Sequence, residues 1–123
     1  MAGVRDLIVY RKAFDLAMDI YRVTRQFPKE ERYALIDQVV RSSRSVTAQL
    51  AEGYRKRRYE AHFVLKLTDA DAENGETQVW LEYANACGHI DEDTYEALIA
   101  RSEEVGRLLG DMIRNPVKYC RHS

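Results

Sequence analysis

The sequence concentrates its positive charge in one short stretch, between Arg41 and Arg58. This stretch holds six basic side chains and one acid, Glu52, which gives it a local net charge of +5. The six bases are Arg41, Arg44, Arg55, Lys56, Arg57 and Arg58. Guanidinium groups form paired hydrogen bonds to phosphates, and the flanking rings of Tyr54 and Tyr59 could stack on unpaired bases. The stretch is therefore a candidate nucleic-acid-binding surface.

Two other interpretations of this basic stretch stay open at this point. Between Asp69 and Glu104 the chain carries eleven acids and one base, Arg101, for a local net charge of −10. The bases could pair with these acids, in the same chain or in a neighbouring subunit. They could also form a turn that is simply solvated. The total net charge of −1 conceals this separation, so it indicates no long-range attraction to nucleic acid or membranes.

Residues that could bind a metal do not form a recognised pattern. Di-iron bundles need a Glu-x-x-His motif on two helices, and the chain contains none. Asp69, Glu73 and Glu76 share one face of a predicted helix and could in principle contact a cation, although a solvated acidic face is the simpler interpretation. Cys120 and His122 lack the second pair of ligands that a structural zinc site requires. We expect no metal site.

Catalytic motifs are also missing from the sequence. No Ser/His/Asp or Cys/His arrangement is indicated, and no glycine-rich loop precedes a predicted helix as phosphate-binding loops require. His62 lies within a predicted helix, where a surface position is the simpler interpretation. We therefore expect no catalytic residue, no cofactor and no small-molecule substrate, and the protein is predicted not to be an enzyme.

Four long amphipathic segments must position the charged side chains. Proline and glycine are sparse, and apolar residues recur at i, i+3 and i+4 between them, as on one face of a helix. Asp91 is the predicted N-cap of the last segment. Short connections between long helices place neighbours antiparallel, so the sequence predicts an all-α, antiparallel up-down-up-down four-helix bundle in a single domain. The predicted helices span residues 6–27, 29–55, 59–87 and 92–114, followed by a C-terminal tail, 115–123.

Small and polar residues interrupt the apolar faces of the last two segments. Ser102, Gly106 and Gly110 recur every four residues, which favours a close helix–helix contact. That contact could lie within the chain or between subunits, so the three residues are candidates for an oligomer interface. Asn74 and Gln78 interrupt an apolar stripe, and a buried amide without a partner costs about 1–3 kcal/mol. We expect at least one of the two amides to be buried and hydrogen-bonded to another helix.

Length and composition agree with a small globular domain. The chain has 123 residues, of which 46% are hydrophobic and 32% charged, so it is neither disordered nor fibrous. Two cysteines are too few for a disulfide framework and suit a reducing compartment. No leader peptide or membrane-spanning run is recognisable. We expect a cytoplasmic protein with no membrane partner.

Several short motifs resemble those of one protein family. They are Asp6-Leu7, Lys12-Ala13, Ile20-Tyr21, Phe27-Pro28, Ala51-Glu52-Gly53-Tyr54 and Glu76-Thr77-Gln78, together with Tyr10, Thr24, Gln38, Arg41, Ser45, Glu60 and Gly88. In this order the sequence resembles the four-helix-bundle family that includes proteins encoded in intervening sequences of large-subunit ribosomal RNA genes. A more distant resemblance links it to the accessory variability protein of diversity-generating retroelements, which binds a reverse transcriptase and nucleic acid.

The resemblance implies an assembly of five bundles around a central pore and no established catalytic residues. Combined with the charge layout, it leads us to expect a non-enzymatic, ring-forming scaffold, a homopentamer, whose basic surface contacts RNA or a nucleic-acid-processing enzyme. The alternative is a protein–protein adaptor or structural oligomer that does not bind nucleic acid.

Overall fold

A computed structural model describes residues 3–120 of the chain, and within that range every regular element is a helix. The four long helices are α1 (Ile8–Thr24), α2 (Asp37–Arg55), α3 (Glu60–Ala86) and α4 (Glu92–Arg114). They pack in the cyclic order α1–α2–α3–α4, with α4 also against α1. The predicted all-α fold with four helices is confirmed.

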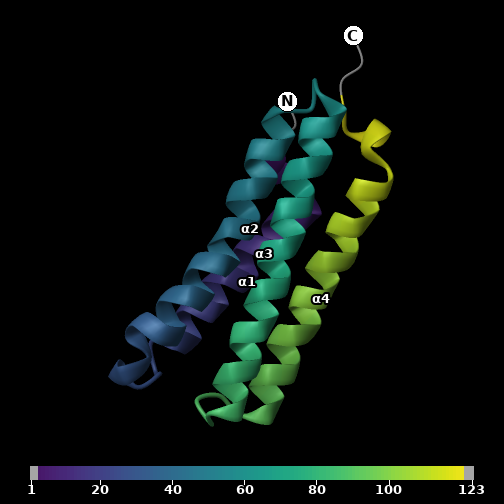
Figure 1. The fold of residues 1–123 in the computed structure, drawn as a ribbon. Helices are drawn as coiled ribbons and strands as arrows, with labels where there is room; N and C mark the ends of the chain where they lie inside the picture. The colour runs from purple at the N-terminus through teal and green to yellow at the C-terminus, as the bar shows by residue number, and fades with distance from the viewer. Residues whose placement is uncertain (1–2, 121–123) are drawn as a thin grey trace.

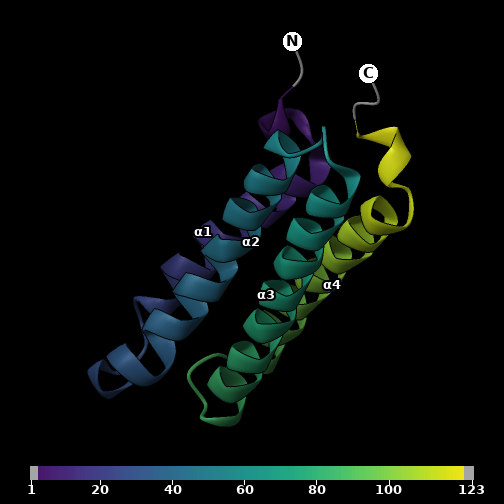
Figure 2. The same ribbon diagram turned by 45° about the horizontal axis from the view of Figure 1, so that its top comes forward.

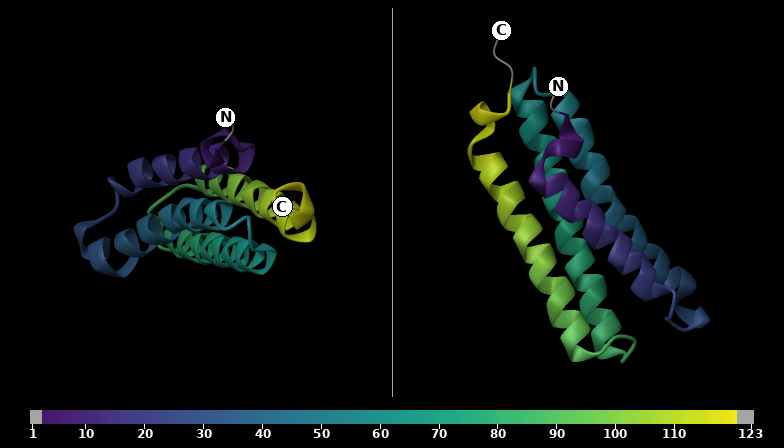
Figure 3. Two further views of the ribbon diagram at one scale, coloured as in Figure 1. Left: turned by 90° about the horizontal axis from the view of Figure 1, so that it is seen from above. Right: turned by 180° about the vertical axis from the view of Figure 1, so that it is seen from behind.

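Three short connections join the helices at alternating ends of the molecule (Figure 1). The α2–α3 connection lies at one end, and the α1–α2 and α3–α4 connections lie at the other. Helix α1 lies behind α2 and α3 in this view and comes to the front when the molecule is seen from behind (Figure 3). This arrangement is compatible with the predicted up-down-up-down order.

The predicted helix boundaries are closest for α3 and α4, whose ends agree within one residue. The first helix is shorter than predicted, because Val4–Asp6 form a separate 3₁₀ turn (η1) and Phe27 is buried beyond the helix end. The prediction of one helix over 29–55 is wrong at its start. Lys29–Glu31 form a 3₁₀ turn (η2) and Arg32–Ile36 a wider π-helical turn (η3), and the α-helix begins only at Asp37.

The other end corrections have local causes. In η3, Leu35 is buried in the core while its neighbours Arg32 and Tyr33 are exposed, so the wider turn accommodates one inward side chain. The Asp91 carboxylate accepts a hydrogen bond of 2.7 Å from the Thr94 amide, which confirms the predicted N-cap of α4. In the predicted tail, Pro116–Lys118 form a 3₁₀ turn (η4), and His122 lies outside the described residues.

The buried core runs along the whole bundle axis as three groups of side chains. Each group draws on several helices, so no pair of helices forms a core of its own. The largest comprises Val9, Ala13, Val46, Leu50, Phe63, Leu67, Ala70, Val105, Leu109 and Met112. The middle group comprises Leu16, Ile20, Val39, Leu81 and Leu98, and the last Phe27, Leu35, Ala84 and Ile90.

A polar network interrupts this core between α3 and α4. The Asn74 amide donates to the Ser102 carbonyl at 2.9 Å, and the Ser102 hydroxyl donates back to Asn74 Oδ1 at 2.9 Å. Gln78 Nε2 donates to the same hydroxyl at 3.0 Å. Asn74 and Ser102 are both buried. The expectation of a buried, hydrogen-bonded amide on the third helix is confirmed.

No helix within the described range 3–120 combines the length and the apolar character needed to cross a lipid bilayer.

Candidate nucleic-acid interface

Gly53 fixes how the basic stretch leaves helix α2. It is buried where α2 meets α3, and a Cβ atom there would lie 2.9 Å from both Leu67 Cδ1 and Lys66 Cβ. Only glycine therefore allows the two helices to approach this closely. Helix α2 ends two residues later at Arg55, and the Lys56 amide donates to the Gly53 carbonyl at 2.9 Å. The close approach positions the α2–α3 connection and its bases at one end of the bundle.

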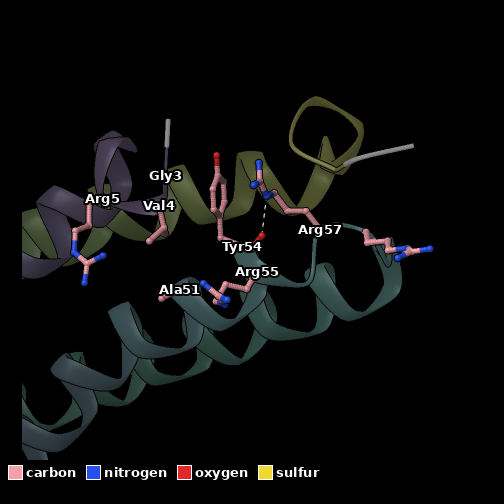
Figure 4. Close-up of a pocket in the computed structure, with 8 residues that line it drawn as sticks. Gly3, Val4, Arg5, Ala51, Tyr54, Arg55 and Arg57 are labelled. Carbon is pink, nitrogen blue, oxygen red and sulfur yellow. Dashed lines mark hydrogen bonds between the residues drawn. The ribbon is translucent and has the colours of Figure 1, made fainter. Parts of the chain in front are cut away.

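An open depression of about 880 Å³ lies at this end. Four arginines line it, from two parts of the chain: Arg5 from η1, Arg55 from the end of α2, and Arg57 and Arg58 from the α2–α3 connection. The remaining lining residues are Gly3, Val4, Ala51 and Tyr54 (Figure 4). None of the described residues that line the depression carries a carboxylate. Its walls are therefore positively charged without a local counter-charge.

Arg57 is held in place by Tyr54. Its Nε donates to the Tyr54 carbonyl at 2.7 Å, and its guanidinium lies over the Tyr54 ring, 3.6 Å from the centroid (Figure 4). The carbonyls of a last helical turn lack intrahelical partners and carry partial negative charge, so a cation there stabilises the helix end. Arg57 therefore has a structural role at the end of α2, and its position in the depression is fixed.

The other bases at this end are more exposed than Arg57. The side chains of Arg5, Arg55, Lys56 and Arg58 are exposed, and the Arg58 guanidinium lies 5.8 Å from the centroid of the Tyr59 ring. Sequence reasoning missed Arg5. It lies far from the basic stretch along the chain, and only the packing of η1 beside α2 brings it to the depression.

Arg41 and Arg44 do not join this surface. Arg41 pairs with two carboxylates of α3, Glu73 at 2.8 Å and Glu76. Burial alone would raise the pKa of Glu73, but hydrogen bonds from Ser45 and Arg41 outweigh it and lower that pKa. For Arg41 the structure thus provides the intramolecular pairing that the sequence left open, because α2 turns this side chain toward α3.

Arg44 lies in a second, smaller depression nearer the opposite end. Its guanidinium is 5.2 Å from the centroid of the Tyr21 ring. The depression has a volume of about 330 Å³ and is lined in part by Arg25, Lys29 and Arg32, but also by the carboxylate of Asp37. The six predicted residues therefore divide into four at one end of the bundle and two elsewhere.

The proposed oligomer contact of Ser102, Gly106 and Gly110 needs correction. Ser102 is completely buried within the chain and bonded to α3, so in this fold it cannot contact another subunit. A Cβ on Gly106 would lie 3.3 Å from Asn74 Nδ2, so this glycine also faces α3. Gly110 is half-buried beneath Arg114 of its own helix. The small residues allow close packing of α4 on α3.

Metal-ligating side chains come together at one place among residues 3–120. Glu73 and Glu76 are engaged by Arg41, and the cluster that forms instead is Glu31, Cys87 and His89, at the end of the bundle far from the arginine depression. Sequence reasoning missed this cluster, although a Cys-x-His sequence at a helix end was a signal.

Comparison with known proteins places this geometry in a family. The model of the 23S rRNA-intervening sequence protein family matches residues 5–111. A crystal structure of a protein of unknown function from the S23 ribosomal protein family of Bacteroides thetaiotaomicron is similar, with a TM-score of 0.77 and 27% sequence identity. The similarity covers 88% of this chain and 100% of that one. No curated protein matches the chain. With a family match that spans nearly the whole bundle, the chain belongs to the 23S rRNA-intervening sequence protein family.

Proposed function

We propose that this protein is a non-enzymatic scaffold that contacts RNA through the arginine-lined end of its bundle and assembles with copies of itself into a ring. The observation that carries the RNA contact is the depression formed by Arg5, Arg55, Arg57 and Arg58, whose described lining residues include no carboxylate. Arginine side chains bind phosphate oxygens through paired N–H groups, and this geometry favours a polyanion over a small neutral ligand.

The fixed Arg57–Tyr54 pair supports a nucleic acid in particular. A cation held over an aromatic ring loses little freedom when it binds a phosphate, so less binding energy is lost to ordering. The ring of Tyr59, which is exposed beside Arg58, can stack on an unpaired base. These features favour single-stranded RNA over a regular duplex, whose bases are not accessible for stacking.

Exposed apolar side chains support the ring. Ile8 and Phe14 on α1, and Leu65, Val79 and Tyr83 on α3, are all exposed in the single chain. Helices α1 and α3 lie diagonally opposite in the cyclic packing order. Two different faces on opposite sides of a subunit are what a head-to-tail ring requires. Five subunits, the number that the family resemblance implies, would have a mass of ~70 kDa.

The proposed ring would repeat the arginine-lined end around one rim. The up-down-up-down order puts the α2–α3 connection, η1 and η4 at the same end (Figure 2). In a ring of parallel subunits these ends form one continuous basic surface. Weak sites linked in this way gain affinity by avidity without new contacts.

RNA binding is tested by fluorescence anisotropy with short single-stranded and duplex RNA at low and at physiological salt. The test variant replaces Arg5, Arg55 and Arg58 with glutamine and leaves the structural Arg57 intact. The matched control replaces Arg25, Lys29 and Arg32, at the second depression, and changes the net charge equally. We expect the test variant alone to lose most binding, with a salt dependence that falls by about 0.7 per lost phosphate contact on a single strand.

Equal binding by the wild type and both variants would leave the alternative, a protein–protein adaptor without nucleic-acid contact. Equal losses in both variants would show attraction by total charge only, and would also refute the proposed site. The ring is tested separately by sedimentation equilibrium. We expect Leu65→Asp and Tyr83→Asp to dissociate it and Val117→Asp, an exposed apolar position in η4, to leave it intact. A monomeric wild type at micromolar concentration would refute the ring.

A further inference from the structure

Two connections that are distant in sequence meet at the end of the bundle opposite the arginine depression. His89 Nε2 lies 2.7 Å from Glu31 Oε2, which joins the α3–α4 connection to η2. Cys87 belongs to the same cluster: its Sγ, a Glu31 carboxylate oxygen and a His89 ring nitrogen all lie within 4.8 Å of one another. Three chemically different ligand atoms are therefore grouped around one point.

The chain builds this cluster with a sharp turn at Gly88. Its φ of +77° lies in the left-handed region, which side chains other than glycine rarely adopt. The Gly88 amide donates to the Asn85 carbonyl at 3.0 Å, and the His89 amide donates to the Ala84 carbonyl at 2.9 Å. These two bonds form the Schellman motif that ends many helices. The motif reverses the chain directly after Cys87 and sets His89 beside it.

The surroundings limit the motion of two of the three ligands. The His89 ring packs on Phe27, with 5.3 Å between ring centroids, and its side chain is only 14% exposed. The Glu31 side chain is 23% exposed. Cys87 is exposed and occupies the C-cap of α3, where its side chain can rotate toward the other two. The cluster thus combines a preformed pair with a thiol at its open side.

We propose that Glu31, Cys87 and His89 bind a divalent transition-metal ion such as Zn²⁺, with water in the fourth position. One thiolate, one imidazole and one carboxylate suit zinc, whereas Mg²⁺ and Ca²⁺ bind oxygen ligands only. In a tetrahedral site with Zn–N and Zn–O bonds of about 2.0–2.2 Å, the two ligand atoms lie ~3.4 Å apart, so the Glu31–His89 contact opens by less than 1 Å. On binding, the metal replaces the Cys87 thiol proton, which passes to solvent.

The bound metal links η2 to the α3–α4 connection and stabilises that end of the bundle. The simpler alternative is a hydrogen bond between Glu31 and His89 with no role for Cys87. The two interpretations differ in what they require of the thiol, because a thiolate ligand gives bound Co²⁺ a charge-transfer absorption that oxygen and nitrogen ligands do not give. Cobalt is therefore the appropriate probe, since it occupies zinc sites and is spectroscopically visible.

The experiment titrates the reduced, tag-free full-length protein with Co²⁺ and follows the thiolate-to-cobalt band. We expect one equivalent to bind, Zn²⁺ to displace it, and Zn²⁺ to raise the melting temperature until a chelator removes it. Cys87→Ser should abolish the band, and His89→Gln or Glu31→Gln should weaken binding by at least ~100-fold, more than outer-shell changes do. Cys120→Ser is the matched control and should retain the band.

Three outcomes would overturn the proposal. These are the absence of a band in the folded wild type at saturating Co²⁺, a band that persists in Cys87→Ser, and equal weak binding by the wild type and all variants, which would indicate an adventitious ion only. Far-ultraviolet circular dichroism of each variant establishes that it is folded. If Glu31→Gln fails to fold, Cys87→Ser, at an exposed position, still decides the question.

Discussion

Removal of the Ser102 hydroxyl tests whether the polar network between α3 and α4 stabilises the fold. In Ser102→Ala, Asn74 Oδ1 loses its donor at 2.9 Å and Gln78 Nε2 loses its acceptor at 3.0 Å. Asn74 is only 3% exposed, so no water replaces the lost donor without a rearrangement of the core. Gln78 is half-buried and can turn its amide toward water.

The expected cost follows from these two environments. A net hydrogen bond contributes about 1 kcal/mol, and a buried acceptor left unpaired costs about 1–3 kcal/mol. Alanine recovers only a few tenths of a kcal/mol through its higher helix propensity. The free energy of unfolding of Ser102→Ala should therefore fall by about 2 kcal/mol.

Ser43→Ala is the matched control. Ser43 is also buried, but its hydroxyl donates only to the Val40 carbonyl of its own helix, at 3.2 Å. That carbonyl keeps its place in the helical ladder, so the control should change stability by less than about 0.5 kcal/mol. Urea unfolding followed by circular dichroism, at one fixed protein concentration, measures both variants. Equal stabilities of Ser102→Ala and Ser43→Ala would refute this account of the network.

Two further perturbations follow from the packing and the charges. Gly53→Ala should lower the free energy of unfolding by about 1–3 kcal/mol, because its Cβ would lie 2.9 Å from Leu67 and Lys66, whereas Gly75→Ala, with no atom within 4 Å, should raise it by up to about 1 kcal/mol; thermal unfolding compares the two, and equal signs would contradict the packing argument. A hydrogen bond from Arg101 lowers the pKa of Asp19 below its usual 3.8, so the pair contributes stability above about pH 4 that is lost as the pH falls through the lower, folded pKa. Arg101→Gln should reduce this acid-induced loss, and parallel stability–pH curves for the variant and the wild type would exclude the contribution.

Features that depend on neighbouring residues in the chain could be predicted from the sequence. The spacing of apolar residues predicted four helices, and the acidic start of the last one predicted the Asp91 cap. The interruption of an apolar stripe predicted the buried amide of Asn74. Each of these depends on contacts within a few turns or on the average burial of one helix face, which the order of residue types specifies. The π-helical turn at Arg32–Ile36 escaped prediction because it deviates from that simple periodicity.

Long-range partners were decided only by the tertiary structure. The sequence left open whether Arg41 binds nucleic acid or a carboxylate, and the rotation of α2 against α3 directs it to Glu73 and Glu76. The same packing places Arg5 with Arg55, and the meeting of two connections places Glu31 beside His89. Charge and periodicity specify which faces of a helix are polar, but not which polar groups meet. The rotation and axial offset of each helix determine that, and they arise from the interlocking of side chains throughout the core.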